Sequence, residues 1–433
     1  MRTDDEIRDL LSRVAKVLIP ASRKAKLLEA ISWPRAVEDQ FFAAGAGALP
    51  SVEYVIERDA ANTRIASLRA LESTIAGDDA LATWLRNTTR AFIDGNRLLL
   101  AVGTAEFHRL SSELYGSART PFLGGGSMCN LDLAVHLEAR LRVLGWDDAS
   151  DPDEPLMRAH EFVENVRERL RERTPHLEID VALDERCTAK VQAGRSRVRV
   201  RHDATFRALE TESLWVHEVE THALTAQNGA AQPHATFLVA GGPRSTRTQE
   251  GLAIFAELYE HSLGIARMER LALRVKLVDM AESGASFLEL YRHLLGLGSE
   301  PRDAYLDAQR ICRGGRVEGG APFTKDACYL AGLLDVYTFL AALTRGGLRD
   351  EVELVVAGRL SLDDIPALIE LRQRGIVDRP RYLPHWLRRW DGLLPYFAFT
   401  SFVGDVALSH VEDRYQRVLE LAARQTAPDK PRS

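Results

Sequence analysis

The sequence predicts a mostly helical α+β protein with a small antiparallel sheet just before a helix that carries two histidines. Apolar residues recur at helical spacing through most of the 433 residues. The spacing changes to strand-like alternation between residues 177 and 203. Helical spacing then returns and continues to about Ala423, and no internal repeat is evident. We therefore expect helices on both sides of one short β segment.

Residues 1–145 form the first predicted region, which is helical. Near its start, Ile7, Leu10, Leu11 and Val14 lie at helical spacing and predict a helix with one buried face. Two glycine-rich breaks, GAGALPS and TPFLGGGSMCN, interrupt the helical pattern. The second break lacks the G-K-[ST] ending and the G-x-G-x-x-G register of phosphate-binding loops. We therefore assign no nucleotide site to it.

The second predicted region covers residues 156–423 and follows the acidic stretch WDDASDPDEP, a predicted linker or surface loop. It begins with an exposed helix that stops at Thr174 and Pro175. The predicted strands come next in the chain, as LEIDVAL, AKVQA and SRVRVRHD. The tail at residues 424–433, RQTAPDKPRS, is predicted to be disordered.

The overall composition is that of a soluble globular protein. Hydrophobic residues make up 45% and charged residues 27% of the chain, and the net charge of -6 gives no basic field for nucleic acid. The four cysteines are scattered, which suits a reducing compartment. The N-terminus is too charged for a secretory signal, and the apolar stretch at 393–403 is too short to span a bilayer. We expect a cytoplasmic protein with neither a nucleic-acid nor a membrane partner.

The stretch HEVETH places His217, Glu218 and His222 close together in a predicted helix. Zinc-protease helices normally read H-E-x-x-H, but these histidines are five residues apart. In a regular α-helix such a pair lies about 140° apart around the axis and cannot easily share one ion. A single π-type turn accommodates one extra residue and would return both histidines to one face. The spacing is therefore compatible with zinc only if the helix is locally distorted.

A third ligand is available downstream, where a helix is predicted to begin near Thr248. Glu250 falls in its first turn, and Glu257 lies seven residues on, on the same face. Glu250 would complete a His-His-Glu set, and Glu257 could orient a ligand histidine. Simpler interpretations remain open: His217 as a core histidine, Glu250 as an acid favoured near a helix N-terminus, and Glu257 as a solvated charge.

Four segments together, HEVETH, NGAAQP, TRTQEGLA and FTKDACYLAG, resemble the family that includes the tubulin tyrosine carboxypeptidases and the bacterial QEGLA-motif proteins. The resemblance is close from about Arg197 to Leu340. It implies a zinc metallopeptidase of the gluzincin type, with His217, His222 and Glu250 as zinc ligands and Glu218 as general base. Family members that act on tubulin remove a C-terminal aromatic residue, which implies a carboxypeptidase.

The chemistry of peptide hydrolysis agrees with these roles. Zinc lowers the pKa of a bound water, and Glu218 can take a proton from that water and deliver it to the leaving amine. A further donor is needed for the oxyanion. Tyr329 is our candidate, with a buried core tyrosine as the alternative. Other hypotheses are a zinc endopeptidase or aminopeptidase, or a non-catalytic regulatory protein that keeps the zinc site.

Substrate binding requires cations, because a carboxypeptidase recognises a free terminal carboxylate. Arg197 and Arg199 alternate with valines on a predicted edge strand that could bind an extended peptide by strand addition, and the arginines would favour an acidic one. The alternative is an edge strand protected by charge. Arg310, Arg313 and Lys325 are further candidates to hold the terminal carboxylate.

Overall fold

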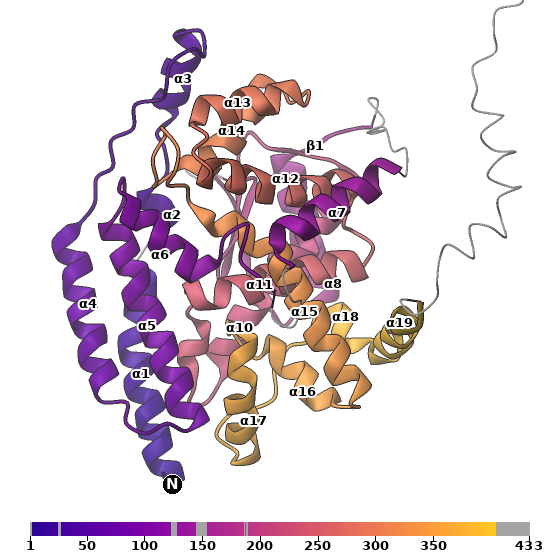
Figure 1. Cartoon of the computed structure of the whole chain (residues 1–433). Helices are drawn as coiled ribbons and strands as arrows, with labels where there is room; N and C mark the ends of the chain where they lie inside the picture. Colours follow the sequence, from indigo (N-terminus) through magenta and orange to yellow (C-terminus); the bar gives the residue numbers. More distant parts are fainter. Residues whose placement is uncertain are drawn as a thin grey trace, which may run out of the picture.

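The computed structural model confirms a mostly helical protein with small sheets (Figure 1). It describes residues 2–24, 27–122, 128–143, 154–185, 187 and 189–403. Most of the predicted acidic linker and the whole predicted tail lie outside these residues. The helices before the sheet are α1 (Asp4–Lys24), α2 (Leu27–Ala30), α3 (Arg35–Ala43), α4 (Arg58–Ser73), α5 (Ala80–Leu100), α6 (Ala105–Tyr115), α7 (Asn130–Val143) and α8 (Ala159–Arg173).

The helices after the sheet include one continuous rod made of α9, the π-helix η1 and α10. Helix α11 packs against η1 of this rod and also contacts α5, α6 and α15, near the centre of the molecule (Figure 1). The rod and its partner are α9 (Ala208–Leu214), η1 (Trp215–Ala223), α10 (Leu224–Ala231) and α11 (Pro243–Tyr259). The later helices are α12 (Ile265–Glu282), α13 (Phe287–Gly296), α14 (Pro301–Cys312), α15 (Cys328–Arg345), α16 (Arg349–Glu353), α17 (Ile365–Gln373), α18 (His385–Arg388) and α19 (Trp390–Val403). Short 3-10 turns are η2 (Thr236–Val239), η3 (Thr324–Ala327), η4 (Leu354–Val356) and η5 (Leu362–Asp364).

The three predicted strands form one sheet, but the prediction of a purely antiparallel sheet was wrong. Strand β4 (Arg197–Arg201) lies in the middle, parallel to β2 (Asp180–Asp184) and antiparallel to β3 (Val191–Ala193). The short connection between β3 and β4 makes that pair a hairpin, and β4 then inserts beside β2. Alternating residues reveal the strands but not the order in which they pair. A separate two-residue pair joins β1 (Met157–Arg158) to β5 (Thr205–Phe206).

The amphipathic pattern at the N-terminus correctly predicts a core face. Ile7, Leu10, Leu11 and Val14 are all buried on α1, which packs against α4 and α5. These three helices stand side by side at one flank of the molecule (Figure 1). Their apolar residues join the same core that contains Trp215 of the π-helix. The N-terminal helices therefore support the rod that carries the two histidines.

Helices α11 and α15 touch backbone to backbone through two glycines. A Cβ added at Gly251 would lie 2.1 Å from the carbonyl oxygen of Gly332, and one added at Gly332 would lie 2.2 Å from the carbonyl oxygen of Arg247. Neither contact leaves room for a side chain. This close approach brings Glu250, which precedes the first glycine, towards residues at the start of α15. The glycine of the QEGLA segment is therefore required by packing.

One segment in the described part of the chain, Thr324–Thr344, is long and apolar enough to cross a membrane by composition alone. In the structure, 56% of the apolar 18-residue window within this segment is buried inside the protein, and α15, which makes up most of it, packs against α11. Its apolar character is therefore accounted for by the core. The apolar stretch at 393–403 lies in α19, where Leu393 and Phe397 are buried, as the sequence predicts, but Leu394 and Phe399 are exposed.

Candidate metal centre

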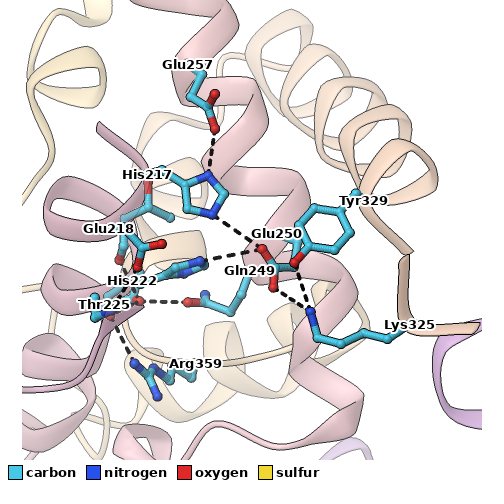
Figure 2. Close-up of polar contacts among 12 residues, drawn as sticks. His217, Glu218, His222, Thr225, Gln249, Glu250, Glu257, Lys325, Tyr329 and Arg359 are labelled. Atoms are coloured by element: carbon cyan, nitrogen blue, oxygen red, sulfur yellow. Dashed lines mark hydrogen bonds and ion pairs between the residues drawn. The ribbon is translucent and has the colours of Figure 1, made fainter. Parts of the chain in front are cut away.

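The π-helix η1 brings His217 and His222 to the same side of the rod. It spans Trp215–Ala223, so the five-residue spacing of the histidines fits one wide turn. Thr221 donates its hydroxyl hydrogen to the carbonyl of Val216, five residues earlier, at 3.0 Å. The two imidazole rings lie edge to face, with centroids 4.8 Å apart and planes at 89° (Figure 2). The predicted distortion is confirmed.

Glu250 reaches the histidines from α11 (Figure 2). Its Oε2 lies 3.4 Å from Nε2 of His217 and 3.7 Å from Nε2 of His222. The predicted start of this helix near Thr248 was wrong, because α11 begins at Pro243. Proline is favoured at the first helical position, so residues 243–247 already belong to the helix. Glu250 thus lies inside the helix, and its place is set by packing rather than by a helix N-terminus.

The three ligand atoms have a spacing that fits a tetrahedral cation. One ligand atom each from His217, His222 and Glu250 lies within 4.8 Å of the others. Ligands bound at about 2.1 Å to one tetrahedral zinc lie about 3.4 Å apart. The two imidazole-to-carboxylate distances are close to this value. His222 and Glu250 are only partly buried, so the group is accessible, whereas His217 is buried.

Glu257 holds the outer nitrogen of His217. Its Oε1 lies 2.6 Å from Nδ1 of the imidazole, and its Oε2 accepts a hydrogen bond from Ser213 at 2.6 Å. Arg267 also donates to both carboxylate oxygens. Burial raises the pKa of Glu257, but Arg267 and His217 outweigh it and lower the pKa to about 2. The carboxylate is fully buried and charged, so the alternative of a solvated charge is wrong.

Replacing Glu257 by Gln is expected to weaken metal retention by about 10- to 100-fold, the usual cost of losing such a partner. A carboxylate that accepts from Nδ1 fixes the ring and leaves Nε2 free to bind the ion. The amide oxygen of Gln can still accept this hydrogen bond, but it lacks the negative charge. Zinc affinity measured by competition with a chelator tests the effect. Glu260→Gln, just past the end of α11 and paired with the exposed His385, serves as the control. Equal affinity in wild type and Glu257→Gln would remove Glu257 from this role.

Glu218 lies beside the ligand group and contacts the sheet. Its Oε2 accepts a hydrogen bond from the backbone N–H of Ala193 in β3 at 2.9 Å. Strand β3 pairs with β4 on one side and is the last strand of the described sheet, so its second side is an edge. The structure therefore places the predicted base between the candidate metal ligands and an open strand edge.

Lys325 and Tyr329 approach Glu250 from the opposite side (Figure 2). Lys325 Nζ donates to Glu250 Oε1 at 2.9 Å and to the Tyr329 hydroxyl at 3.0 Å. Arg310 donates to the same hydroxyl at 3.2 Å and also binds Asp326. The sequence singled out these cations as carboxylate receptors. In the structure, Lys325 is already paired with Glu250, and Arg310 is already paired with Asp326.

The other predicted substrate cations make the following contacts with residues outside the ligand group. Arg197 forms an ion pair with Asp180 at 3.1 Å, and Arg199 donates to Gln192 at 2.7 Å. Both belong to the central strand β4, so the prediction that they lie on an edge strand was wrong. Arg313 lies over the ring of Phe323, 5.8 Å from its centroid.

The sequence does not predict two further contacts of the site. Thr225 donates to Gln249 Oε1 at 2.8 Å and so links the rod to α11. Arg359 donates from Nη2 to the backbone carbonyl of His222 at 3.4 Å (Figure 2). Arg359 comes 137 residues after His222, and no local pattern marks it. Only the tertiary fold brings it to the centre.

The fold and the site together have the residues of a metallopeptidase: two histidines, a glutamate and an adjacent second glutamate. Residues 39–405 match the family described as microtubule-associated tyrosine carboxypeptidase. The chain belongs to this family, as the resemblance of its motifs predicts, and is therefore a member of a carboxypeptidase family.

One solved structure, Trypanosoma cruzi metallocarboxypeptidase 1, is similar to this chain over 95% of the chain and 99% of that protein. The two share 16% sequence identity, with a TM-score of 0.37. No curated protein sequence matches the chain.

Proposed function

We propose that this protein is a zinc-dependent carboxypeptidase that removes a C-terminal aromatic residue, preferably tyrosine, from a peptide or protein. The observation that carries the proposal is the gathering of His217, His222 and Glu250 next to Glu218. The first three residues would hold the ion, since two imidazoles and a carboxylate at this spacing suit zinc. The preference for tyrosine rests on the family's description.

Zinc, when bound, supplies Lewis-acid polarisation of a water and of the substrate carbonyl. Glu218 is placed to accept a proton from the attacking water and to return it to the leaving amine. Its hydrogen bond to the Ala193 N–H holds the carboxylate at the edge of the site. A protein that kept the metal only for structure would have no need of such a base, which argues against the regulatory alternative.

Tyr329 is our candidate donor for the developing oxyanion. Its oxygen accepts hydrogen bonds from both Lys325 and Arg310, and these two donors occupy its lone pairs. The hydroxyl hydrogen is therefore directed away from them and is available to another acceptor. Tyr329 is 9% exposed and lies next to Glu250, so this donor acts in a largely dry environment.

We place the substrate main chain along β3 instead of β4. The unpaired edge of β3 carries the Ala193 N–H that contacts Glu218, so a peptide added there would pass the base. Arg199 lies on the neighbouring strand and is partly exposed, so it can still attract an acidic chain at low salt. The partner we propose is thus the C-terminus of a peptide or protein, and the cytoplasmic location stays a prediction.

C-terminal amidation of a good substrate is expected to lower cleavage by well over tenfold, whereas N-terminal acetylation leaves it unchanged. A desolvated cation that loses its carboxylate costs about 2–5 kcal/mol. Digestion of matched peptides ending in tyrosine, read by mass spectrometry, tests the direction of attack. Blocking by acetylation alone would indicate an aminopeptidase, and indifference to both changes an endopeptidase. No cleavage of any peptide by the zinc-loaded protein would favour the regulatory alternative.

A further inference from the structure

Arg267, Arg310, Lys325 and Arg359 are four cations that each interact electrostatically with Glu250, and the first three already hold a carboxylate. Arg267 binds Glu257, Arg310 binds Asp326, and Lys325 binds Glu250 itself. The fourth cation is Arg359, which also acts on Glu218. No carboxylate pairs with Arg359 among the residues that the structure describes.

Within the described residues, the guanidinium of Arg359 makes one hydrogen bond, to the carbonyl of His222 at 3.4 Å. This bond uses one of its five N–H groups, so most of its donors are free for a ligand. The side chain is partly exposed, and burial lowers its pKa while Glu218 and Glu250 oppose that change. A charge taken out of water without a counterion is costly, and proteins keep such a group where a charged ligand binds.

The backbone that carries Arg359 is held firmly. Its N–H donates to the carbonyl of Leu238 at 2.8 Å, and the N–H of Leu362 donates to Thr248 at 3.2 Å. A Cβ at Gly358 would lie 2.6 Å from the Leu238 side chain, so the chain is tightly packed there. The Cα of Arg359 is therefore held in place, so binding has to order only the side chain, which limits the entropy lost.

We propose that Arg359 binds the free α-carboxylate of the substrate's last residue. The proposal rests on the carboxypeptidase function above and assigns the receptor which that function needs. Consecutive Cα atoms are about 3.8 Å apart, so the terminal carboxylate lies within one residue of the bond that is cleaved. A receptor must then reach the immediate surroundings of the metal ligands, as the contact of Arg359 with His222 allows. A guanidinium also matches a carboxylate with two parallel hydrogen bonds.

Arg310 is less suited to this role, although the sequence pointed to it. Its guanidinium binds Asp326 and Tyr329, and Asp326 is 2% exposed. Turning Arg310 towards a substrate would leave Asp326 buried and short of a partner, at a large cost. Arg359 can bind a carboxylate without breaking an ion pair.

The test compares binding of a dye-labelled peptide ending in tyrosine, as free acid and as amide, by fluorescence anisotropy. The protein is the zinc-loaded Glu218→Gln variant, which binds without turning substrate over. Adding Arg359→Met is expected to weaken binding of the free acid by about 30-fold or more and to bring it close to that of the amide. Arg359→Lys restores the charge and should recover part of the loss. Arg247→Met, which removes an arginine of α11 whose partner Asp335 is a third exposed, should leave the preference intact.

Three outcomes would overturn the assignment: an unchanged preference in Arg359→Met, equal loss of affinity for acid and amide, or loss of the preference in Arg313→Met instead. Thermal unfolding of each variant separates binding from folding, and Arg359→Met should unfold near the wild-type midpoint. Because binding is measured without turnover, failure of the protein to hydrolyse any peptide would count against the proposed function alone. A carboxylate preference that disappears with Arg359 would stand in either case.

Discussion

Replacing Glu218 by Gln is expected to lower the rate of peptide hydrolysis by about 10²- to 10⁴-fold, the usual contribution of a general base. Gln keeps the size of Glu218 and can still accept from the Ala193 N–H, so the sheet edge and the metal ligands stay in place. The change removes only the ability to accept and return a proton. The turnover number should therefore fall while zinc content and peptide affinity stay close to wild type.

The matched control is Glu220→Gln, two residues further along the same π-helix. Glu220 is 3% exposed, and burial and the nearby Glu260 raise its pKa. It is absent from the ligand group, and its neutral replacement should leave hydrolysis unchanged. Equal loss of activity in both variants would indicate a general disturbance of η1. Full activity in Glu218→Gln would mean that another group is the base.

The metal ligands could be predicted because their chemistry restricts the choice. Two histidines five residues apart can share an ion only in a widened helix, so the chemistry predicts the distortion that η1 shows. The residue type of Glu250 and the family resemblance together predict it as the third ligand. The predicted start of its helix is too late in the chain, because proline is accepted at the first helical position and α11 already begins at Pro243.

The surroundings of the ligands could not be predicted, because they depend on contacts between distant segments. Whether β4 is an edge or a centre depends on which strand pairs with its second side, and alternation of residues carries no such information. The pairing of Lys325 with Glu250 depends on two glycines that let α11 and α15 touch. Arg359 stands in a stretch with no motif, and only its loop geometry directs it to His222.

Replacing Glu250 by Ala is expected to have two large effects that can be measured separately. It removes a residue that binds the ion directly. Zinc affinity should therefore fall by at least roughly 100-fold, the upper cost of losing a residue that only hydrogen-bonds to a ligand. It also leaves the ammonium of Lys325, 8% exposed, without its carboxylate. Breaking one side of a buried ion pair typically destabilises a protein by about 3–5 kcal/mol. Elemental analysis reports the first effect, and denaturant unfolding in excess chelator reports the second without any contribution from the metal.

The double variant Glu250→Ala with Lys325→Met separates ligand loss from charge burial. Methionine has a similar length and carries no charge, so the free energy of unfolding should recover most of what Glu250→Ala lost. Zinc should remain absent, because the third ligand is still missing. Zinc at one ion per chain in Glu250→Ala would exclude Glu250 as a ligand. A double variant as unstable as Glu250→Ala would show that Glu250 stabilises the fold through contacts other than Lys325.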